Sequence, residues 1–127
     1  MRKGFTLLEL IIVIIIIGIL GALGFVQYGR VVERGRTAEA KSIIGQLRSA
    51  QEAYRLEYGN YSATLANLVI DAPTGCTTTH YFWYGTLNNI GGAQRCTGSG
   101  KTPNGTLAYN ITINYTSGVW GGTAGYY

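Results

Sequence analysis

Apolar residues run almost without interruption through the first quarter of the chain. From Leu10 to Val26 no residue carries a charge or a side-chain amide, and a helix of this length approaches the hydrocarbon thickness of a bilayer. The pattern predicts a membrane helix over Phe5–Val26. Because Arg2 and Lys3 precede it, the positive-inside rule predicts a cytoplasmic N-terminus and export of the C-terminal remainder.

The next segment, 27–58, has the pattern of an amphipathic helix. Four apolar residues recur at helical spacings of four, three and four: Ile43, Leu47, Ala50 and Tyr54. No proline occurs before Pro73, and Gly59-Asn60 is a suitable C-terminal stop. We therefore expect one continuous helix of about fifty residues, hydrophobic in its first half and amphipathic in its second.

Beyond Gly59 the periodicity changes from helical to period two. Alternation is clearest in Leu107–Tyr115, which predicts a half-buried strand. His80–Leu87 is a second strand candidate and Val119-Trp120 a third. Between the first two, Thr102–Thr106 predicts a turn in which Asn104-Gly105 adopts positive φ.

These elements predict an α+β fold in which a long N-terminal α-helix packs on a small antiparallel β-sheet. The sheet needs a cover for its apolar face, and segment 27–58 is the long amphipathic element available for it. The chain then divides into a basic leader (1–4), a hydrophobic helix (5–26), an amphipathic half-helix (27–58) and an exported β-rich part (59–127).

The charge distribution and the cysteines limit the functions that the chain can have. Arg2 and Lys3 supply half of the net charge of +4, and beyond Tyr58 the charged residues are Asp71, Arg95 and Lys101, so no basic patch exists for specific nucleic-acid binding. Two cysteines, Cys76 and Cys96, lie in the exported part, where we expect one disulfide. A metal site formed by these cysteines with His80 and Asp71 is the alternative, although the spacing matches no zinc motif.

The residue inventory argues against an enzyme. The chain has one histidine and one aspartate, and no nucleophile, base and orienting group stand at an interpretable spacing.

Aromatic residues are densest in Tyr81–Tyr84. Alternating members of this run are expected to fill the core and the others to face neighbours or solvent; sugar adhesion and electron transfer through exposed rings are alternatives.

Glu9 stands out in the apolar segment. An ionised carboxylate at the centre of a bilayer costs about 2.5–3.5 kcal/mol on insertion scales, so it needs a partner or a position near the interface. No Lys or Arg lies between Phe5 and Val26. Cleavage after Gly4 would create a cationic partner for Glu9, because the new α-amine of Phe5 would be positively charged.

The N-terminal segment resembles the class III signal of bacterial type IV pilins and type II secretion pseudopilins. The matching residues are Lys3, Gly4, Phe5, Thr6, Leu7, Glu9 and Gly18, followed by Gln27-Tyr28. The resemblance implies a pilin-like fold, cleavage between Gly4 and Phe5 by a prepilin peptidase, and N-methylation of Phe5. It also implies filament assembly through Phe5, Thr6 and Glu9, in which Glu9 pairs with the Phe5 amine of a neighbouring subunit.

Other interpretations of these residues remain open. Glu9 could pair with the Phe5 amine of its own chain, or extend its carboxylate to the membrane boundary. The segment could also be an ordinary secretory signal cleaved near Ala22-Leu23-Gly24. Val26 stands where the resembling proteins often have a helix-bending proline, so Gly18, Gly21 and Gly24 are candidates for local melting or for close helix packing.

The leading functional hypothesis is a structural subunit, a major pilin of a type IV pilus, with no cofactor. Its expected partners are copies of itself in a helical filament, the inner membrane before assembly, the prepilin peptidase and the pilus assembly machinery. The expected final location is an extracellular surface filament, where adhesion, motility, DNA uptake and electron transfer all remain open. A major pseudopilin of a secretion system is the alternative, and a membrane-anchored monomeric binding protein is a third.

Overall fold

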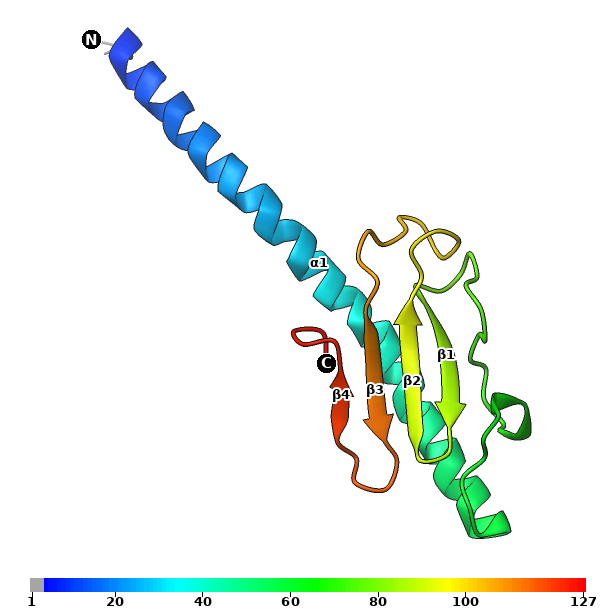
Figure 1. The fold of residues 1–127 in the computed structure, drawn as a ribbon. Helices are drawn as coiled ribbons and strands as arrows, with labels where there is room; N and C mark the ends of the chain where they lie inside the picture. Colours follow the sequence, from blue (N-terminus) through cyan, green and yellow to red (C-terminus); the bar gives the residue numbers. More distant parts are fainter. Residues whose placement is uncertain (1–3) are drawn as a thin grey trace. The chain divides into compact units, whose positions relative to one another are not determined.

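The predicted α+β architecture is confirmed in a computed structural model that describes residues 4–127. The elements, in chain order, are α1 (Leu7–Tyr58), the 3-10 helix η1 (Leu65–Asn67), β1 (Phe82–Leu87), β2 (Ile90–Arg95), β3 (Asn110–Asn114) and β4 (Trp120–Gly122) (Figure 1). The chain divides into two compact units, the first ending at Gly35 and the second comprising Arg36–Tyr127.

Helix α1 is continuous over 52 residues, as predicted, and it ends where the glycine signal placed its stop. Gly59 has a φ of 81°, and its N–H donates to the carbonyl oxygen of Arg55 at 2.8 Å. This left-handed residue satisfies one of the last helical carbonyls, and glycine adopts the conformation without a steric penalty.

The four strands form one antiparallel sheet in the order β1-β2-β3-β4, so each strand pairs with its neighbour in sequence. All three predicted strands are present. Two are shorter than predicted, because β1 begins at Phe82 and β3 comprises Asn110–Asn114, whereas β4 begins one residue later than predicted and continues to Gly122. Strand β2 was not predicted.

The predicted position of the tight turn was wrong. Asn104-Gly105 is not in the positive-φ region. Among residues 4–127, the non-glycine residue with a positive φ is Asn88, at 49°. Asn88 lies in the hairpin between β1 and β2, where Leu87 and Ile90 are paired and only two residues connect the strands. A two-residue hairpin loop demands left-handed backbone, and asparagine tolerates it.

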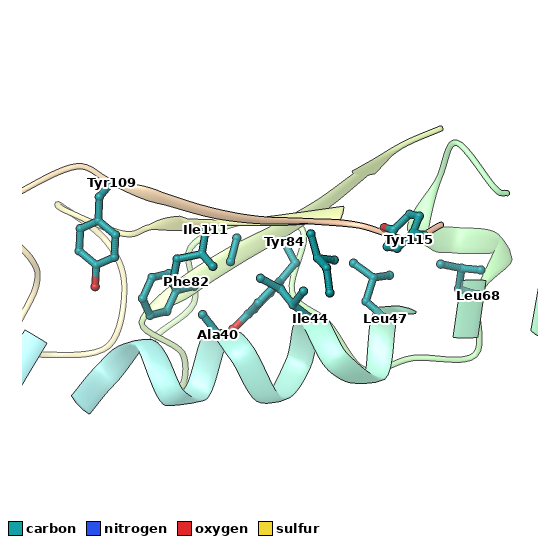
Figure 2. Packing of buried hydrophobic residues seen from close by; sticks show 11 residues of the cluster. Ala40, Ile44, Leu47, Leu68, Phe82, Tyr84, Tyr109, Ile111 and Tyr115 are labelled. Atoms are coloured by element: carbon teal, nitrogen blue, oxygen red, sulfur yellow. The ribbon is translucent and has the colours of Figure 1, made fainter. Parts of the chain in front are cut away.

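The core of the second unit lies between the amphipathic part of α1 and one face of the sheet (Figure 2). From the helix, Ala40, Ile44 and Leu47 are fully buried. The side chains that oppose them come from alternate positions of the strands and from the strand ends: Phe82, Tyr84, Ala93, Tyr109, Ile111, Ile113 and Tyr115. The core thus forms where every second side chain of the strands packs against helix side chains spaced three or four residues apart.

The helical stripe that faces the sheet is rotated from the predicted one. Of the predicted positions, Leu47 is at its centre, whereas Ile43, Ala50 and Tyr54 are only partly buried along one side. The central positions are Ala40, Ile44, Leu47 and Gln51. Sequence reasoning missed this rotation because it assigned the stripe by hydrophobicity, and a polar residue occupies one of the central positions.

Gln51 is fully buried and its amide is saturated. Its Nε2 donates to the carbonyl oxygen of Ser62 at 2.9 Å and to Thr86 Oγ1 at 2.8 Å, while its Oε1 accepts from the Ser62 N–H at 2.8 Å. Thr86 Oγ1 also lies 2.7 Å from the hydroxyl oxygen of Tyr115. Burial raises the pKa of this tyrosine. These bonds join the helix, the loop after it and the sheet, and a buried amide needs such partners.

Arg95 is a second buried polar residue, with 2% of its surface exposed. Its Nη1 donates to the carbonyl oxygens of Cys96 at 2.7 Å and Tyr81 at 3.1 Å, and its Nη2 to that of Pro103 at 3.4 Å. The guanidinium carbon also lies 5.1 Å from the centroid of the Tyr81 ring. Arg95 therefore ties the loop that follows β2 to the start of β1.

Both edges of the sheet are short or covered. Strand β4, at one edge, has three residues. At the other edge, the N–H of Tyr84 in β1 donates to the carbonyl oxygen of Pro73 at 2.8 Å, so the segment before the strand lies along it. Backbone groups that a free edge would leave unpaired are thereby partly satisfied.

The predicted disulfide between Cys76 and Cys96 is confirmed. It joins the segment before β1 to the residue that follows β2, and Cys96 is buried while Gly100 lies against its side chain. Because the two sulfurs are bonded to each other, they are not free to ligate a metal ion. The bridge closes a loop with a sequence separation of 20.

Replacing Cys76 and Cys96 with alanine is expected to lower the free energy of unfolding of the exported part by about 3 kcal/mol. Without the bridge the unfolded chain has more conformational entropy, and for a loop of this length the difference in free energy has that size. Urea unfolding of the full chain in lipid nanodiscs, followed by tryptophan fluorescence, measures the change. Reduction of the unaltered chain is the control and should give the same loss. Equal unfolding midpoints for the oxidised and reduced chains would contradict the prediction.

Candidate functional site at the start of the helix

The structure places Gly4, Phe5 and Thr6 in an exposed, non-helical stretch directly before α1. Glu9 lies in the first turn of that helix. Phe5 is 88% exposed, and no side chain from elsewhere packs on this stretch in the described chain. The residues expected to serve in cleavage, methylation and assembly are thus adjacent and accessible.

Thr6 and Glu9 form a reciprocal capping box. The Thr6 N–H and hydroxyl each donate to Glu9 Oε2 at 2.8 Å, and the Glu9 N–H donates to Thr6 Oγ1 at 3.2 Å. Thr6 is therefore the N-cap, and Glu9 is the third helical residue. A carboxylate at this position also interacts favourably with the positive end of the helix dipole. Sequence reasoning missed the box, although the Thr-x-x-Glu spacing signals it.

The two carboxylate oxygens of Glu9 differ in their surroundings. Oε2 accepts both bonds from Thr6, whereas Oε1 has no hydrogen-bond partner within residues 4–127. An ionised carboxylate has about four lone-pair sites, so Glu9 can keep its cap and accept further donors. In the uncut chain the Phe5 nitrogen belongs to a peptide bond. The ion pair implied for the cleaved chain therefore stays a prediction.

The apolar side chains that follow Glu9 are exposed along the whole first part of α1. An 18-residue window of this helix has a mean hydropathy of 2.9 and is long and apolar enough to cross a membrane, and none of the window is buried within the chain. Exposed apolar surface of this extent is unfavourable in water and indicates a membrane or other chains as its surroundings.

Gly18, Gly21 and Gly24 lie within the continuous helix. Apart from the adjoining residues and the backbone of the surrounding helical turns, no atom of the described chain is within 4 Å of the place where a Cβ would stand at any of the three. Gly21 and Gly24, with Phe25 and Tyr28, line a shallow hollow of about 350 Å³ on the helix surface. Close packing against a neighbouring helix and local melting both remain predictions for these glycines.

The described residues offer no metal centre. Within residues 4–127, no three side chains of His, Cys, Asp or Glu come together in a way that could hold an ion. His80, one of the residues considered for such a site, has its Nδ1 at 2.9 Å from Thr79 Oγ1 and 3.2 Å from Thr77 Oγ1.

Comparison with protein families gives two matches. Residues 1–25 match the prokaryotic N-terminal methylation motif, which contains Gly4, Phe5, Thr6 and Glu9. Residues 37–125, more than half of the chain, match the family described as type IV pilin-like G and H. No curated protein matches the chain. The chain therefore belongs to the type IV pilin-like G and H family, and it is a structural subunit of the pilin or pseudopilin kind.

Proposed function

We propose that this chain is the major subunit of a type IV pilus. The observation that carries the proposal is the exposed apolar helix that begins with a capped carboxylate, one oxygen of which has no partner in the described chain. A simple membrane anchor gains nothing from such a group, because a carboxylate in an apolar span is costly unless it has a function.

Processing is the first step of the proposal. A prepilin peptidase hydrolyses the peptide bond between Gly4 and Phe5; the carbonyl carbon of Gly4 takes the hydroxyl of water, and Phe5 keeps the amine. A methyl donor then transfers its methyl group to that amine; the bond between the donor and the methyl carbon breaks, an N–C bond forms, and the nitrogen loses a proton. Both residues precede the helix and are exposed, which supports access for both reactions.

Assembly is the second step. In the membrane, the bonds from Thr6 partly satisfy the carboxylate of Glu9 and lower the cost of burying it. When the subunit docks at the base of a filament, Glu9 Oε1 accepts from the methylated Phe5 amine of a neighbouring subunit. The low dielectric strengthens this pair, and its position favours one axial stagger between neighbouring helices.

The choice of a pilin over a secretion pseudopilin rests on the acidic residues. The resemblance associates major pseudopilins with calcium-binding acids in the exported domain, and calcium takes six to eight oxygen ligands. Beyond Tyr58 the chain has one acidic residue, Asp71. This distribution supports the pilus.

The test combines electron microscopy of filaments sheared from cells with mass spectrometry of the subunit's N-terminal peptide. Long surface filaments whose subunits begin with N-methylated Phe5 are expected. Short filaments confined to the periplasm, formed by the same processed subunit, would identify a pseudopilin instead. An uncut chain, or one cut near Gly24, would contradict both forms of the proposal.

A further inference from the structure

The sheet face that points away from α1 has an unusual composition. In Figure 1 the amphipathic part of α1 runs along one face of the sheet and leaves the other uncovered. Alternate strand positions point to that outer face because neighbouring side chains on a strand lie on opposite sides. They are Trp83, Gly85, Leu87, Ile90, Gly92, Gln94, Asn110, Thr112, Asn114 and Gly121, and none of them carries a charge.

Strand pairing arranges these residues in rows across the sheet. Gly85 pairs with Gly92, Gly92 with Thr112 and Thr112 with Gly121, so one row consists of three glycines and a threonine. Directly opposite residues of an antiparallel pair lie on the same face. The row without large side chains therefore forms a shallow trough.

The neighbouring row gives the trough one wall. Trp83 pairs with Gln94, and Gln94 with Asn110, which places an indole ring and two side-chain amides in line. Trp83 is 39% exposed, a high fraction for a tryptophan. The hollow between the rows has a volume of about 170 Å³ and is lined by Trp83, Gly85, Gly92, Ala93, Gln94, Asn110 and Thr112.

The polar groups around the hollow have unused hydrogen-bonding capacity. Within residues 4–127 the Gln94 amide and the Thr112 hydroxyl have no hydrogen-bond partner, and the bond recorded for the Asn110 side chain is to Thr123 Oγ1, at 3.0 Å. Each amide can donate and accept, which matches adjacent hydroxyl groups of a ligand. The ring face of a tryptophan carries partial negative charge and attracts electron-poor C–H groups.

We propose that the hollow beside Trp83 binds one ring of an uncharged saccharide. The C–H face of the pyranose stacks on the Trp83 indole, and its hydroxyl groups bond to the amides of Gln94 and Asn110 and to Thr112. Gly85 and Gly92 keep the floor low enough for the ring to approach. This function is independent of filament assembly.

Size and charge support a sugar over the other occupants. The volume is below the roughly 300–1,000 Å³ of pockets that hold drug-sized molecules, so it suits a single ring. A protein interface buries about 800 Å² on each partner and is enriched in aromatic residues, Met and Arg. The hollow presents one aromatic ring, and its other polar side chains are those of glutamine, asparagine and threonine. An acidic ligand would find no cationic side chain among the strand residues of this face.

Two substitutions test the site in complementary ways. Trp83→Ala removes the stacking surface. Gly85→Val fills the floor, and a Cβ there would meet the Trp83 ring at an ordinary 3.8 Å, so the sheet should tolerate it. The matched controls lie outside the hollow. Tyr58→Ala removes another exposed ring. Gly98→Val adds the same side chain at a place where, apart from residue 98 and its two chain neighbours, no atom of the described chain lies within 4 Å of the new Cβ.

The measurement is saturation-transfer NMR on the full chain in phosphatidylcholine nanodiscs, because detergents with sugar headgroups would compete. The probes are methyl glycosides of glucose, galactose, mannose and N-acetylglucosamine, with glucuronate as the charged comparison. At least one neutral glycoside should bind with a Kd on the order of 1 mM, and glucuronate should not bind. Trp83→Ala and Gly85→Val should each weaken binding roughly tenfold or more, while both control variants bind normally.

Three outcomes would overturn the proposal. The first is that no neutral glycoside binds the unaltered chain. The second is that binding survives both site substitutions in chains whose near-ultraviolet circular dichroism shows normal folding. The third is that Gly85→Val changes the association of subunits while no glycoside binds, which would identify the face as a contact between copies of the chain.

Discussion

Replacing Glu9 with glutamine is expected to lower the yield of sheared filaments roughly tenfold or more, with normal amounts of subunit in the membrane. Glutamine keeps the capping box, since its amide oxygen can accept from Thr6, but it removes the charge that, in the proposed assembly step, pairs with a neighbouring Phe5 amine. Each 1.4 kcal/mol lost from a docking step weakens it about tenfold, and a charge pair in a low-dielectric setting exceeds that value. Immunoblots of the sheared and membrane fractions measure both quantities.

Two further variants separate the charge of Glu9 from its capping role. Thr6→Ser retains the hydroxyl that bonds Glu9 and should assemble normally. Glu9→Ala removes charge and cap together, so it should also reduce the amount of stable subunit in the membrane. Filaments of normal yield from Glu9→Gln would show that the carboxylate is not used in docking, and would remove the main support for the proposed assembly step.

Replacing Arg95 with alanine is expected to destabilise the exported part by about 3 kcal/mol or more. The substitution leaves a cavity and deprives the carbonyl oxygens of Tyr81, Cys96 and Pro103 of their charged donor. For a domain of this size, such a loss lowers the melting temperature by roughly 12–24 °C. Thermal unfolding of the full chain in nanodiscs, followed by near-ultraviolet circular dichroism, measures it.

The variants Arg95→Lys and Lys41→Ala serve as comparisons. Arg95→Lys keeps the charge but loses the planar fork that reaches several carbonyls, so an intermediate loss is expected. Lys41 is exposed on the helix, and Lys41→Ala should change stability by no more than about 0.5 kcal/mol. A melting temperature of Arg95→Ala equal to that of Lys41→Ala would refute a structural role for the buried guanidinium.

The long helix was predictable because each of its signals is local. Apolar and amphipathic periodicity extend over many turns, and Gly59 marks the stop. The strand ending at Asn114 was found for the same reason, since its alternation is regular. Its predicted start was three residues early because Leu107, which fits the alternation, is exposed and lies outside the strand.

Strand β2 could not be found locally because tertiary contacts determine its residues. Gly91 and Gly92 interrupt any alternation, yet a Cβ at Gly91 would collide with the Tyr115 hydroxyl group. Glycine is therefore required at position 91 because the side chain of Tyr115, distant in sequence, occupies the place of a Cβ. Gln51 and Arg95 were missed for a related reason: their burial depends on partners in loops that no periodicity reveals.

The functional role of the candidate site stays a prediction, and only its geometry can be compared with the sequence. The resemblance singled out Phe5, Thr6 and Glu9, and the structure adds that Thr6 already occupies one oxygen of the Glu9 carboxylate. The capping box could have been read from the sequence spacing. The free oxygen could not, because it depends on the rotamer of the glutamate side chain.

The covered edges of the sheet matter most when many subunits stand close together. At such local concentrations an open strand would recruit its counterpart on the next molecule and fuse the two sheets into a cross-β aggregate. The segment at Pro73 occupies part of the β1 edge, and the three residues of β4 offer little to pair with. Crowded copies of this domain, as the proposed filament requires, can therefore remain separate folding units.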